Sequence, residues 1–349
     1  MSTTIGYAVQ NAQSPLAPFQ FERREIGPRD VEIDILFCGI CHSDLHQARN
    51  HWGTSQYPMV PGHEIIGRVS QVGSQVSNIK PGDFAGVGCM VDSCRHCANC
   101  REGLEQYCLA GPTWTYNAKE PGFERMTYGG YSKRIIVNDH FVVKIPKQMD
   151  LKSAAPLLCA GITMYSPLRH WKIASGHKVG IIGLGGLGHM GIKLAKAMGA
   201  HVVMITSSPG KVADAERLGA SDVLLSSDPS QLAKHTNSFD LLINTIPNAH
   251  DVNPYLQLLI RDGTMVLVGL LTGLEPSVLG VNIMAQRRRL AGSIIGGLAE
   301  TQEMIEFCAQ HGVGSDVEVI SMDYVNEAFS RMLKNDVKYR FVIDMASLK

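Results

Sequence analysis

The chain has 349 residues, of which 45% are hydrophobic and 18% are charged, enough for two domains with a core each. Lysine plus arginine and aspartate plus glutamate both number 32, so no overall field favours nucleic acid or an anionic membrane. No apolar run is long enough to span a bilayer, and residues 1–5 lack the basic and apolar pattern of an export signal. We therefore expect a cytoplasmic protein, with no membrane or nucleic-acid partner, that acts on a small molecule.

The first third of the chain is predicted to be rich in β-strands. Residues 31–37 alternate polar and apolar side chains, and 65–72 and 83–87 are further predicted strands. Turn signals at Lys80–Asp83 and Gly129–Gly130 separate such segments. This pattern favours a partly closed, β-barrel-like domain.

Residues 41–46 (Cys-His-Ser-Asp-Leu-His) and 61–64 (Pro-Gly-His-Glu) contain the ligand types that Zn²⁺ prefers. A catalytic zinc has three protein ligands and one open position, and Cys41 and His63 can supply two of them. We predict Cys159 as the third. The alternative for Cys159 is a buried free cysteine, which is common.

A second cluster combines Cys94, Cys97, Cys100 and Cys108. Four thiolates so spaced can close a tetrahedral shell around Zn²⁺ and stabilise a lobe of the chain. An iron–sulfur cluster also uses four thiolates and is the rival interpretation. Nine cysteines without an export signal favour metal over disulfides, and Cys38, Cys89 and Cys308 are assigned no metal.

From Lys178 onward the pattern changes to alternating strands and helices. A strand at 178–182 leads into a glycine turn and a helix that ends near Met198. Further strands are predicted at 201–205, 222–225, 239–244, 264–268 and 290–295. This succession predicts an α/β domain with a doubly wound parallel (Rossmann) sheet. The turn follows a strand and opens a helix, the context in which glycines let a backbone approach a pyrophosphate, so it predicts dinucleotide contacts at Gly183, Leu184, Gly185, Gly186, Leu187 and Gly188.

The second strand of this sheet lacks the terminal carboxylate that would bind the adenosine ribose of NAD. It is followed by Thr206, Ser207 and Ser208, whose hydroxyls can donate to a 2′-phosphate, and by Lys211, which adds positive charge. NADP(H) is therefore favoured, the alternative being a helix cap followed by a solvated lysine. The carboxyl ends of later strands predict further cofactor contacts at Thr245, Gly269, Ser293 and Ile294.

The last part of the chain is predicted to rejoin the first domain. Helices at 300–311 and 326–334 and an apolar strand at 340–344 follow the parallel-sheet pattern. We predict one domain from residues 1–155 and 296–349 and a second from 156–295. The run 287–289 of three arginines is interpreted as a solvated helix end.

Together these motifs resemble the zinc-dependent medium-chain alcohol dehydrogenases. The resemblance rests on Gly62-His63-Glu64, the four-cysteine cluster, the glycine turn and residues 336–344. Residues 158–163 and 165–168 are similar to the cinnamyl-alcohol-dehydrogenase branch, which includes bacterial NADPH-dependent aldehyde reductases.

The resemblance implies a GroES-like catalytic domain, with a catalytic zinc on Cys41, His63 and Cys159 that Glu64 can also approach. It implies that Asp44 orients His63, that Ser43 and His46 pass on the alcohol's proton, and that Thr163 contacts the nicotinamide. It further implies a homodimer joined through the strand near 290–295. An apolar substrate pocket is expected around Trp52, Cys89, Trp114 and Ile295.

The predicted function is hydride transfer between NADP(H) and a primary alcohol or aldehyde, aromatic or medium-chain aliphatic, mainly as an aldehyde reductase. Zn²⁺ would act as a Lewis acid on the oxygen, and the protein would supply position and charge. One alternative is an NAD-linked polyol or amino-alcohol dehydrogenase. Another is a zinc module that binds nucleic acid or protein, which the balanced charge disfavours.

Overall fold

The computed structural model describes residues 2–269 and 273–349, which form two units. The first unit runs to Cys159 and resumes at Gly296–Lys349, and the second is Ala160–Ile295. Met1, the first residue of the expected first domain, lies outside the described residues. No helix among the described residues has both the length and the apolar character needed to cross a bilayer.

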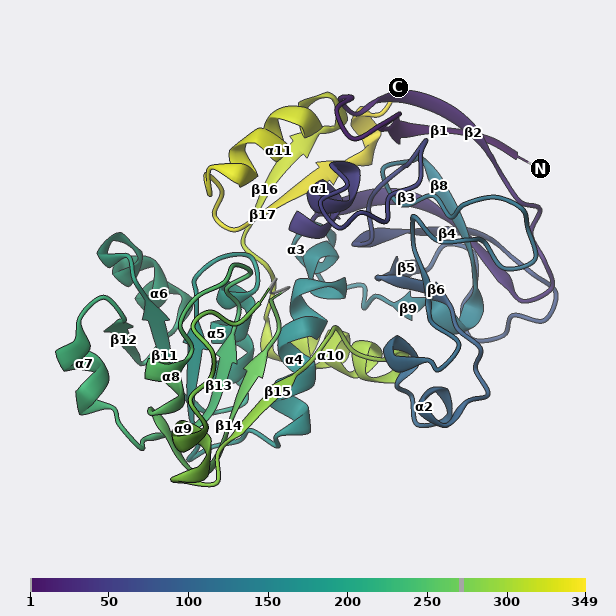
Figure 1. The fold of residues 1–349 in the computed structure, drawn as a ribbon. Coiled ribbons are helices and arrows are strands. Elements are labelled where there is room, and N and C mark those ends of the chain that lie inside the picture. Colours follow the sequence, from purple (N-terminus) through teal and green to yellow (C-terminus); the bar gives the residue numbers. More distant parts are fainter. Residues whose placement is uncertain (1, 270–272) are drawn as a thin grey trace. The chain divides into compact units, whose positions relative to one another are not determined.

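The first unit is built mainly of strands (Figure 1). Its elements are β1 (Ser2–Ala8), β2 (Ala17–Arg23), β3 (Asp30–Ile40), α1 (His42–Ala48), β4 (Ile65–Val72), β5 (Phe84–Val87), β6 (Met90–Asp92), α2 (Ala98–Arg101), β7 (Thr113–Trp114), β8 (Arg134–Asn138), β9 (Val143–Lys144), α3 (Leu151–Ala154), α10 (Leu298–His311), β16 (Val317–Ser321), α11 (Val325–Leu333) and β17 (Arg340–Asp344). The largest sheet has the order β16-β17-β3-β4-β5-β9, and β8 pairs with the first half of β3.

β3 is the central strand of this sheet. It pairs antiparallel with β4, β8 and β17, and register shifts at Glu32/Ile33 and Ile35/Phe37 bend it as expected in a partly closed sheet. Val31, Ile33 and Ile35 are buried while Asp34 is exposed, which is the alternation seen in the sequence. β17 lies beside β3, so the predicted return of the last strand to the first domain is confirmed.

The second unit contains one six-stranded parallel sheet in the order β12-β11-β10-β13-β14-β15. Its elements are α4 (Ala160–His170), β10 (Lys178–Ile182), α5 (Gly188–Ala197), β11 (His201–Thr206), α6 (Val212–Leu218), β12 (Asp222–Leu225), α7 (Pro229–Lys234), β13 (Phe239–Asn244), α8 (Asn253–Leu256), β14 (Leu259–Leu267), α9 (Gly280–Met284) and β15 (Arg289–Gly292). The first strand, β10, lies in the middle, so the strand order reverses beside it. This confirms the predicted doubly wound fold.

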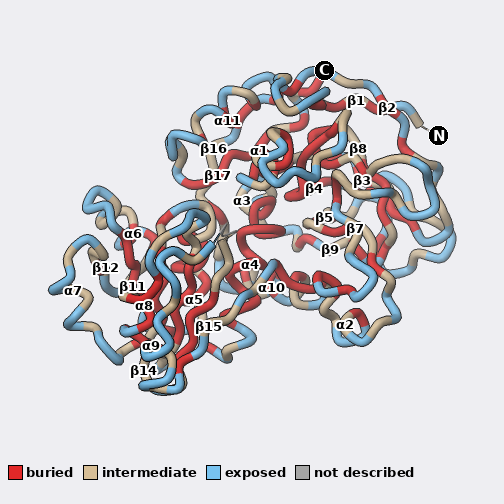
Figure 2. The backbone as a smooth tube through the Cα atoms, viewed as in Figure 1, coloured by how far each residue is buried: buried red, intermediate tan, exposed pale blue. Residues whose placement is uncertain are grey.

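The strands of the parallel sheet carry continuous buried stretches because other parts of the unit cover them (Figure 2). Val179–Ile182 and Val202–Thr206 are buried throughout. The turn after β10 depends on two glycines. Gly183 has a φ of 95°, and a Cβ on Gly188 would overlap the carbonyl oxygen of Gly183.

Three expectations need correction. β15 ends at Gly292 and not at Ile295, because Ile295 has a left-handed φ of 38° that a strand cannot adopt. The first boundary between units follows Cys159 and not residue 155, because residues 155–158 form a buried 3-10 helix against β3, β4 and β5. Arg288 is not solvated: it is buried and donates to Leu259 O, Asn282 O and Asn237 Oδ1 at 2.9, 2.7 and 2.6 Å.

Candidate active site and metal centres

Four side chains that could hold a metal converge in the first unit. One ligand atom each from Cys41, His63, Glu64 and Cys159 lies within 4.8 Å of the others, and all four residues are buried. Cys41 follows β3 and caps α1, whereas His63 and Glu64 lead into β4. The pairing of these two strands, continued by a 2.9 Å hydrogen bond from Gly39 N to Glu64 O, holds the two segments together. Cys159 ends the 3-10 helix that packs on the same strands.

The carboxylate of Asp44 connects the two segments. Its Oδ2 accepts from the Cys41 amide at 2.9 Å, and its Oδ1 accepts from the Gly62 amide and from His63 Nδ1, both at 3.0 Å. Asp44 has no exposed surface. Since Nδ1 of His63 is held by Asp44, Nε2 is the ring atom left for metal binding.

Glu64 is held by a buried arginine from the far end of the sequence. Arg340 Nη2, at the start of β17, pairs with Glu64 Oε1. Burial raises the pKa of Glu64 to about 8, and the charge of Arg340 acts in the opposite direction. The second oxygen, Oε2, is buried without a hydrogen-bond partner in the described chain.

The two thiols of this cluster differ in their ionisation. Cys41 Sγ and Cys159 Sγ are 4.0 Å apart. The hydrogen bond from Cys159 holds the pKa of Cys41 well below its usual value, and the same interaction raises the pKa of Cys159. Arg340 adds to the lowering at Cys41. A thiolate is therefore favoured even in this buried position.

The donor set fits a zinc ion. It combines two thiols, an imidazole whose Nδ1 is held by Asp44 and a carboxylate oxygen without a hydrogen-bond partner among the described residues, all within reach of one another. These are ligand types that Zn²⁺ takes, and a buried polar atom such as Glu64 Oε2 is otherwise costly.

α1 and the turn that follows it carry the other predicted residues of this region. Ser43 is half-buried on α1, and His46 Nδ1 lies 2.8 Å from Nδ1 of His51 in the turn. Trp52 and Trp114 are exposed. Cys89 is half-buried, and a hydrogen bond from Cys159 lowers the pKa of Cys89, so this thiol lies beside the metal cluster.

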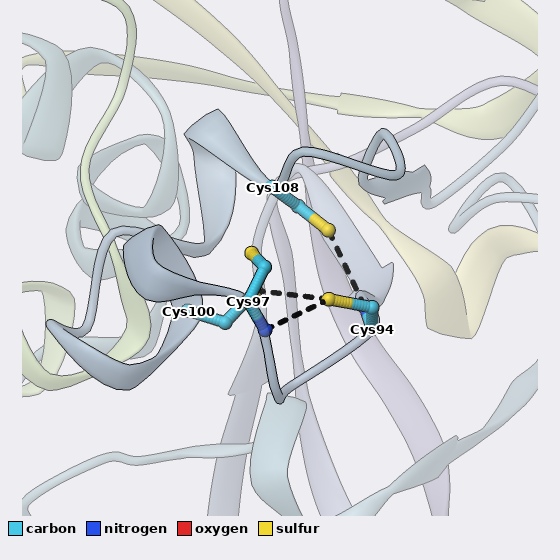
Figure 3. A group of neighbouring side chains, drawn as sticks. All are labelled: Cys94, Cys97, Cys100 and Cys108. Carbon is cyan, nitrogen blue, oxygen red and sulfur yellow. Dashed lines mark hydrogen bonds between the residues drawn. The ribbon is translucent and has the colours of Figure 1, made fainter.

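The four predicted cysteines of the second cluster also meet, with ligand atoms within 4.8 Å of one another (Figure 3). Cys94 Sγ is 3.9 Å from Cys100 Sγ. Backbone amides point at the sulfurs: Cys94 N to Cys108 Sγ and Cys97 N to Cys94 Sγ at 3.4 Å, and Leu109 N to Cys97 Sγ at 3.5 Å. Amide hydrogen bonds, with Leu109 first, lower the pKa of Cys97 to about 6. Burial raises the pKa of Cys100 to about 12, so the four thiols differ in ionisation. Four cysteine sulfurs within reach of one another fit a structural zinc.

Glu105 attaches this lobe to the rest of the unit. Its Oε1 accepts from His140 Nε2 at 2.9 Å, and its Oε2 accepts from the Leu298 amide at the start of α10 at 3.1 Å. Burial acts to raise the pKa of Glu105, but the hydrogen bond from His140 and those from backbone amides outweigh it, so the pKa is lowered.

In the second unit the predicted cofactor residues gather at the carboxyl ends of neighbouring strands. Lys211 Nζ donates to Leu184 O at 2.9 Å, which brings the lysine after β11 to the glycine turn after β10. Thr206 is buried, Ser207 and Ser208 are exposed, and a Cβ on Gly185 would meet open space. The Thr245 hydroxyl donates to Ile182 O at 2.8 Å and to Gly183 O at 3.1 Å. Thr245 therefore also supports the turn.

The remaining predicted cofactor contacts lie on other elements and differ in burial. Gly269 follows β14, and a Cβ there would crowd the Ile246 carbonyl. Ser293 and Ile294 lie beyond the end of β15, with Ile294 exposed, and Ile295 is buried. Thr163 is buried in α4.

Sequence reasoning missed Arg340, His51 and two tyrosines, Tyr116 and Tyr131. Tyr131 donates to Asp44 Oδ2 at 3.4 Å, and hydrogen bonding to Asp44 contributes to a raised pKa of Tyr116, after burial and charge. A basic residue at the head of a final apolar strand was the available signal for Arg340. No local pattern distinguishes the tyrosines from core residues.

Comparison with known proteins shows the family. Residues 27–147 match the family described as alcohol dehydrogenase GroES-like domain, and residues 186–310 match zinc-binding dehydrogenase. The chain is 53% identical to the aldehyde reductase YahK of Escherichia coli over 97% of each chain. It is 52% identical to the NADP-dependent alcohol dehydrogenase C 1 of Mycolicibacterium smegmatis over the full length of both. The chain belongs to the zinc-binding alcohol dehydrogenases, and it is an oxidoreductase.

Comparison with solved structures supports the same family assignment. A cinnamyl alcohol dehydrogenase from Sorghum bicolor superimposes with a TM-score of 0.96 at 45% identity, covering 100% of this chain and 99% of that one. The cinnamyl alcohol dehydrogenase of Helicobacter pylori, complexed with NADP(H), gives 0.92 at 39% identity, covering 99% and 98%.

The attachment of the four-cysteine lobe can be tested with Glu105→Gln. The amide keeps the shape but loses a charge-assisted acceptor, so we expect the free energy of unfolding at pH 7 to fall by about 1–3 kcal/mol. Because the pKa of Glu105 is lowered, this stabilisation is present above its unfolded pKa and is lost as the pH falls through the lower folded value. Urea midpoints of variant and wild type should therefore converge in acid. A difference that does not depend on pH would contradict this account.

Proposed function

We propose that this chain is an NADP(H)-dependent zinc enzyme that interconverts aldehydes and primary alcohols, mainly by reducing the aldehyde. The observation that carries the proposal is the buried cluster of Cys41, His63, Glu64 and Cys159, a mixed donor set rather than a closed shell of four thiolates. The names of the aldehyde reductase and of the NADP-dependent alcohol dehydrogenases among its relatives support the same activity.

Cys41, His63 and Cys159 would hold the catalytic zinc, and Glu64 would approach it when the open position changes ligand. Zinc bound there would supply a Lewis acid that polarises the substrate oxygen. Asp44 orients His63 and stabilises its Nδ1–H tautomer, while Arg340 keeps the Glu64 carboxylate in place. The second zinc, on Cys94, Cys97, Cys100 and Cys108, would stabilise the lobe.

The proton that the alcohol loses, or that the aldehyde gains, requires a path. Ser43 and His46 lie one helical turn apart on α1, whose N-terminus carries Cys41. Partial burial, followed by the charges of His42 and His51, lowers the pKa of His46. At neutral pH His46 is therefore mostly neutral and able to accept a proton.

NADP(H) would bind at the carboxyl edge of the parallel sheet. The glycine turn 183–188 would receive the pyrophosphate, and Thr206, Ser207, Ser208 and Lys211 would bind the 2′-phosphate. Thr245, Gly269, Ser293 and Ile294 would line the remainder, with Thr163 at the nicotinamide. The hydrogen bond between Lys211 and Leu184 supports this, since it brings the cation to the turn.

The proposed substrate class, aromatic or medium-chain aliphatic, is based on apolar and sulfur-containing side chains near the candidate metal site. Trp52, Cys89 and Trp114 of the first unit would contact an aromatic or medium-chain aliphatic group, and such side chains offer little to a polyol. The cinnamyl alcohol dehydrogenases among the relatives support an aromatic substrate.

A homodimer would cover the free edge of the parallel sheet. β15 is the last strand in the sheet order, and the adjoining α9 segment exposes Leu279, Val281 and Met284 at 55%, 65% and 81%. Edge strands next to exposed apolar side chains favour pairing with another copy.

The role of Cys159 predicts a loss of activity with the fold retained. In Cys159→Ala we expect turnover to fall by more than about a hundredfold, since loss of a residue that only orients a metal ligand already costs 10- to 100-fold. Metal analysis should show one zinc per chain in place of two. Cys308→Ala removes another buried thiol, in α10 beside Met304, and should keep both zincs and full activity. Normal rates in Cys159→Ala would remove it from the site.

The role of Lys211 predicts a change in cofactor preference. Lys211→Ala should lower kcat/KM for NADPH by roughly 10- to 100-fold, the equivalent of one hydrogen bond to a charged group, and leave kcat/KM for NADH nearly unchanged. Lys234→Ala, at an exposed lysine of the same unit, is the control. If the wild type prefers NADH, or if Lys211→Ala lowers kcat/KM equally for both cofactors, Lys211 does not bind a 2′-phosphate.

The proposed dimer predicts a particle of twice the chain mass by light scattering. Val281→Glu and Met284→Glu should raise the dissociation constant at least about tenfold, because two like charges would meet across a symmetric interface. Leu109→Glu, at an exposed apolar residue of the first unit, should leave the mass unchanged. A monomeric wild type would disprove this arrangement.

A further inference from the structure

The turn after α1 brings the Nδ1 atoms of two imidazoles together on the surface of the first unit. His46 Nδ1 and His51 Nδ1 are 2.8 Å apart, and the ring centroids are 5.1 Å apart. His51 is exposed and His46 is half-buried, so dissolved ions can reach the pair. Neither residue belongs to the two ligand clusters already described.

The backbone sets this arrangement. His51 N donates to His46 O at 2.9 Å, and Asn50 N donates to Gln47 O at 3.0 Å. Asn50 has a left-handed φ of 55°, which reverses the chain after the helix, and its side chain accepts from Ser55 N at 3.0 Å. The backbone of the turn therefore holds the two histidines close to each other.

The spacing suits a chelated metal ion. Two nitrogens bound to one tetrahedral Zn²⁺ at about 2.0–2.1 Å lie roughly 3.3 Å apart, so the rings need to separate by only about half an ångström. In the neutral pair one Nδ1 carries the hydrogen of the contact. If that hydrogen moves to Nε2 of the same ring, both Nδ1 lone pairs face the ion and no proton is released.

We propose that His46 and His51 form a third, exchangeable binding site for a divalent transition-metal ion such as Zn²⁺. The site provides two imidazole ligands, and water completes the coordination. Neutral imidazole is a common ligand of such ions, and the lowered pKa of His46 reduces competition from protons. With two ligands and no thiolate, the site binds more weakly than the thiolate clusters.

Occupation of this site has a functional consequence that rests on the proposed function. If His46 passes the proton of the reaction, an ion on its Nδ1 engages the relay residue, and excess Zn²⁺ inhibits the enzyme. Zinc would thus serve as a resident ion of the cysteine clusters and as an inhibitor at the histidine pair.

The test is a calorimetric titration of untagged holoenzyme with Zn²⁺, after dialysis against a weak chelator that leaves the cysteine-bound metal in place. We expect one additional ion per chain in wild type. His46→Gln and His51→Gln should each weaken this binding at least about tenfold, because each removes one of two ligands. His311→Gln, at an exposed histidine of α10, should bind like wild type. Binding by His51→Gln that equals wild type would overturn the proposal, as would no additional ion in wild type.

Inhibition distinguishes this site from the proposed function. Aldehyde reduction with NADPH should slow as the additional ion binds, and His51→Gln should need at least about tenfold more Zn²⁺ for the same fractional loss relative to its own uninhibited rate. An ion that binds to wild type, is lost in His51→Gln and does not inhibit would support the metal site and contradict the role of His46 in proton transfer.

Discussion

The buried carboxylate of Asp44 is the interaction on which the candidate site depends. It receives amide hydrogens from Cys41 and Gly62 and the Nδ1 hydrogen of His63, so one side chain fixes the positions of two candidate metal ligands. A carboxylate without exposed surface is stable only when its oxygens accept hydrogen bonds. Here the donors are groups of the candidate site itself. The same hydrogen bonds therefore position the candidate ligands and stabilise the buried carboxylate.

The two cysteine-containing clusters differ in burial and hydrogen bonding, which suits one to a structural role and the other to a catalytic role. In the lobe, backbone amides donate to the sulfurs of Cys94, Cys97 and Cys108, and amide hydrogen bonds lower the pKa of Cys97. In the other cluster, Arg340 and the neighbouring thiol adjust the charge of Cys41, and a carboxylate oxygen of Glu64 remains unpaired. The first arrangement would close the shell of a bound ion, and the second would leave a position for exchange.

Much of the architecture could be predicted, because regular patterns report local structure. β10, β12 and β13 have the bounds that hydrophobicity and turn residues indicated, and the meeting of each cysteine cluster followed from ligand chemistry. Long-range polar pairing could not be predicted in the same way. The sequence around Arg288 suggests a solvated residue, yet its guanidinium donates hydrogen bonds to backbone carbonyls of β14 and α9. Arg340 pairs with a residue from the opposite end of the chain, and no local spacing encodes that contact.

The pairing of Arg340 with Glu64 also has a consequence for biosynthesis. The second unit is contiguous in sequence, whereas the first unit is split, and its sheet lacks β17 until Arg340–Asp344 has emerged from the ribosome. Until then Glu64 lacks the charge of Arg340, and residues 37–40 of β3 lack the strand that pairs with them. The buried centre can therefore form completely only after Arg340 has been synthesised, although Cys41, His63 and Cys159 lie in the first half of the chain.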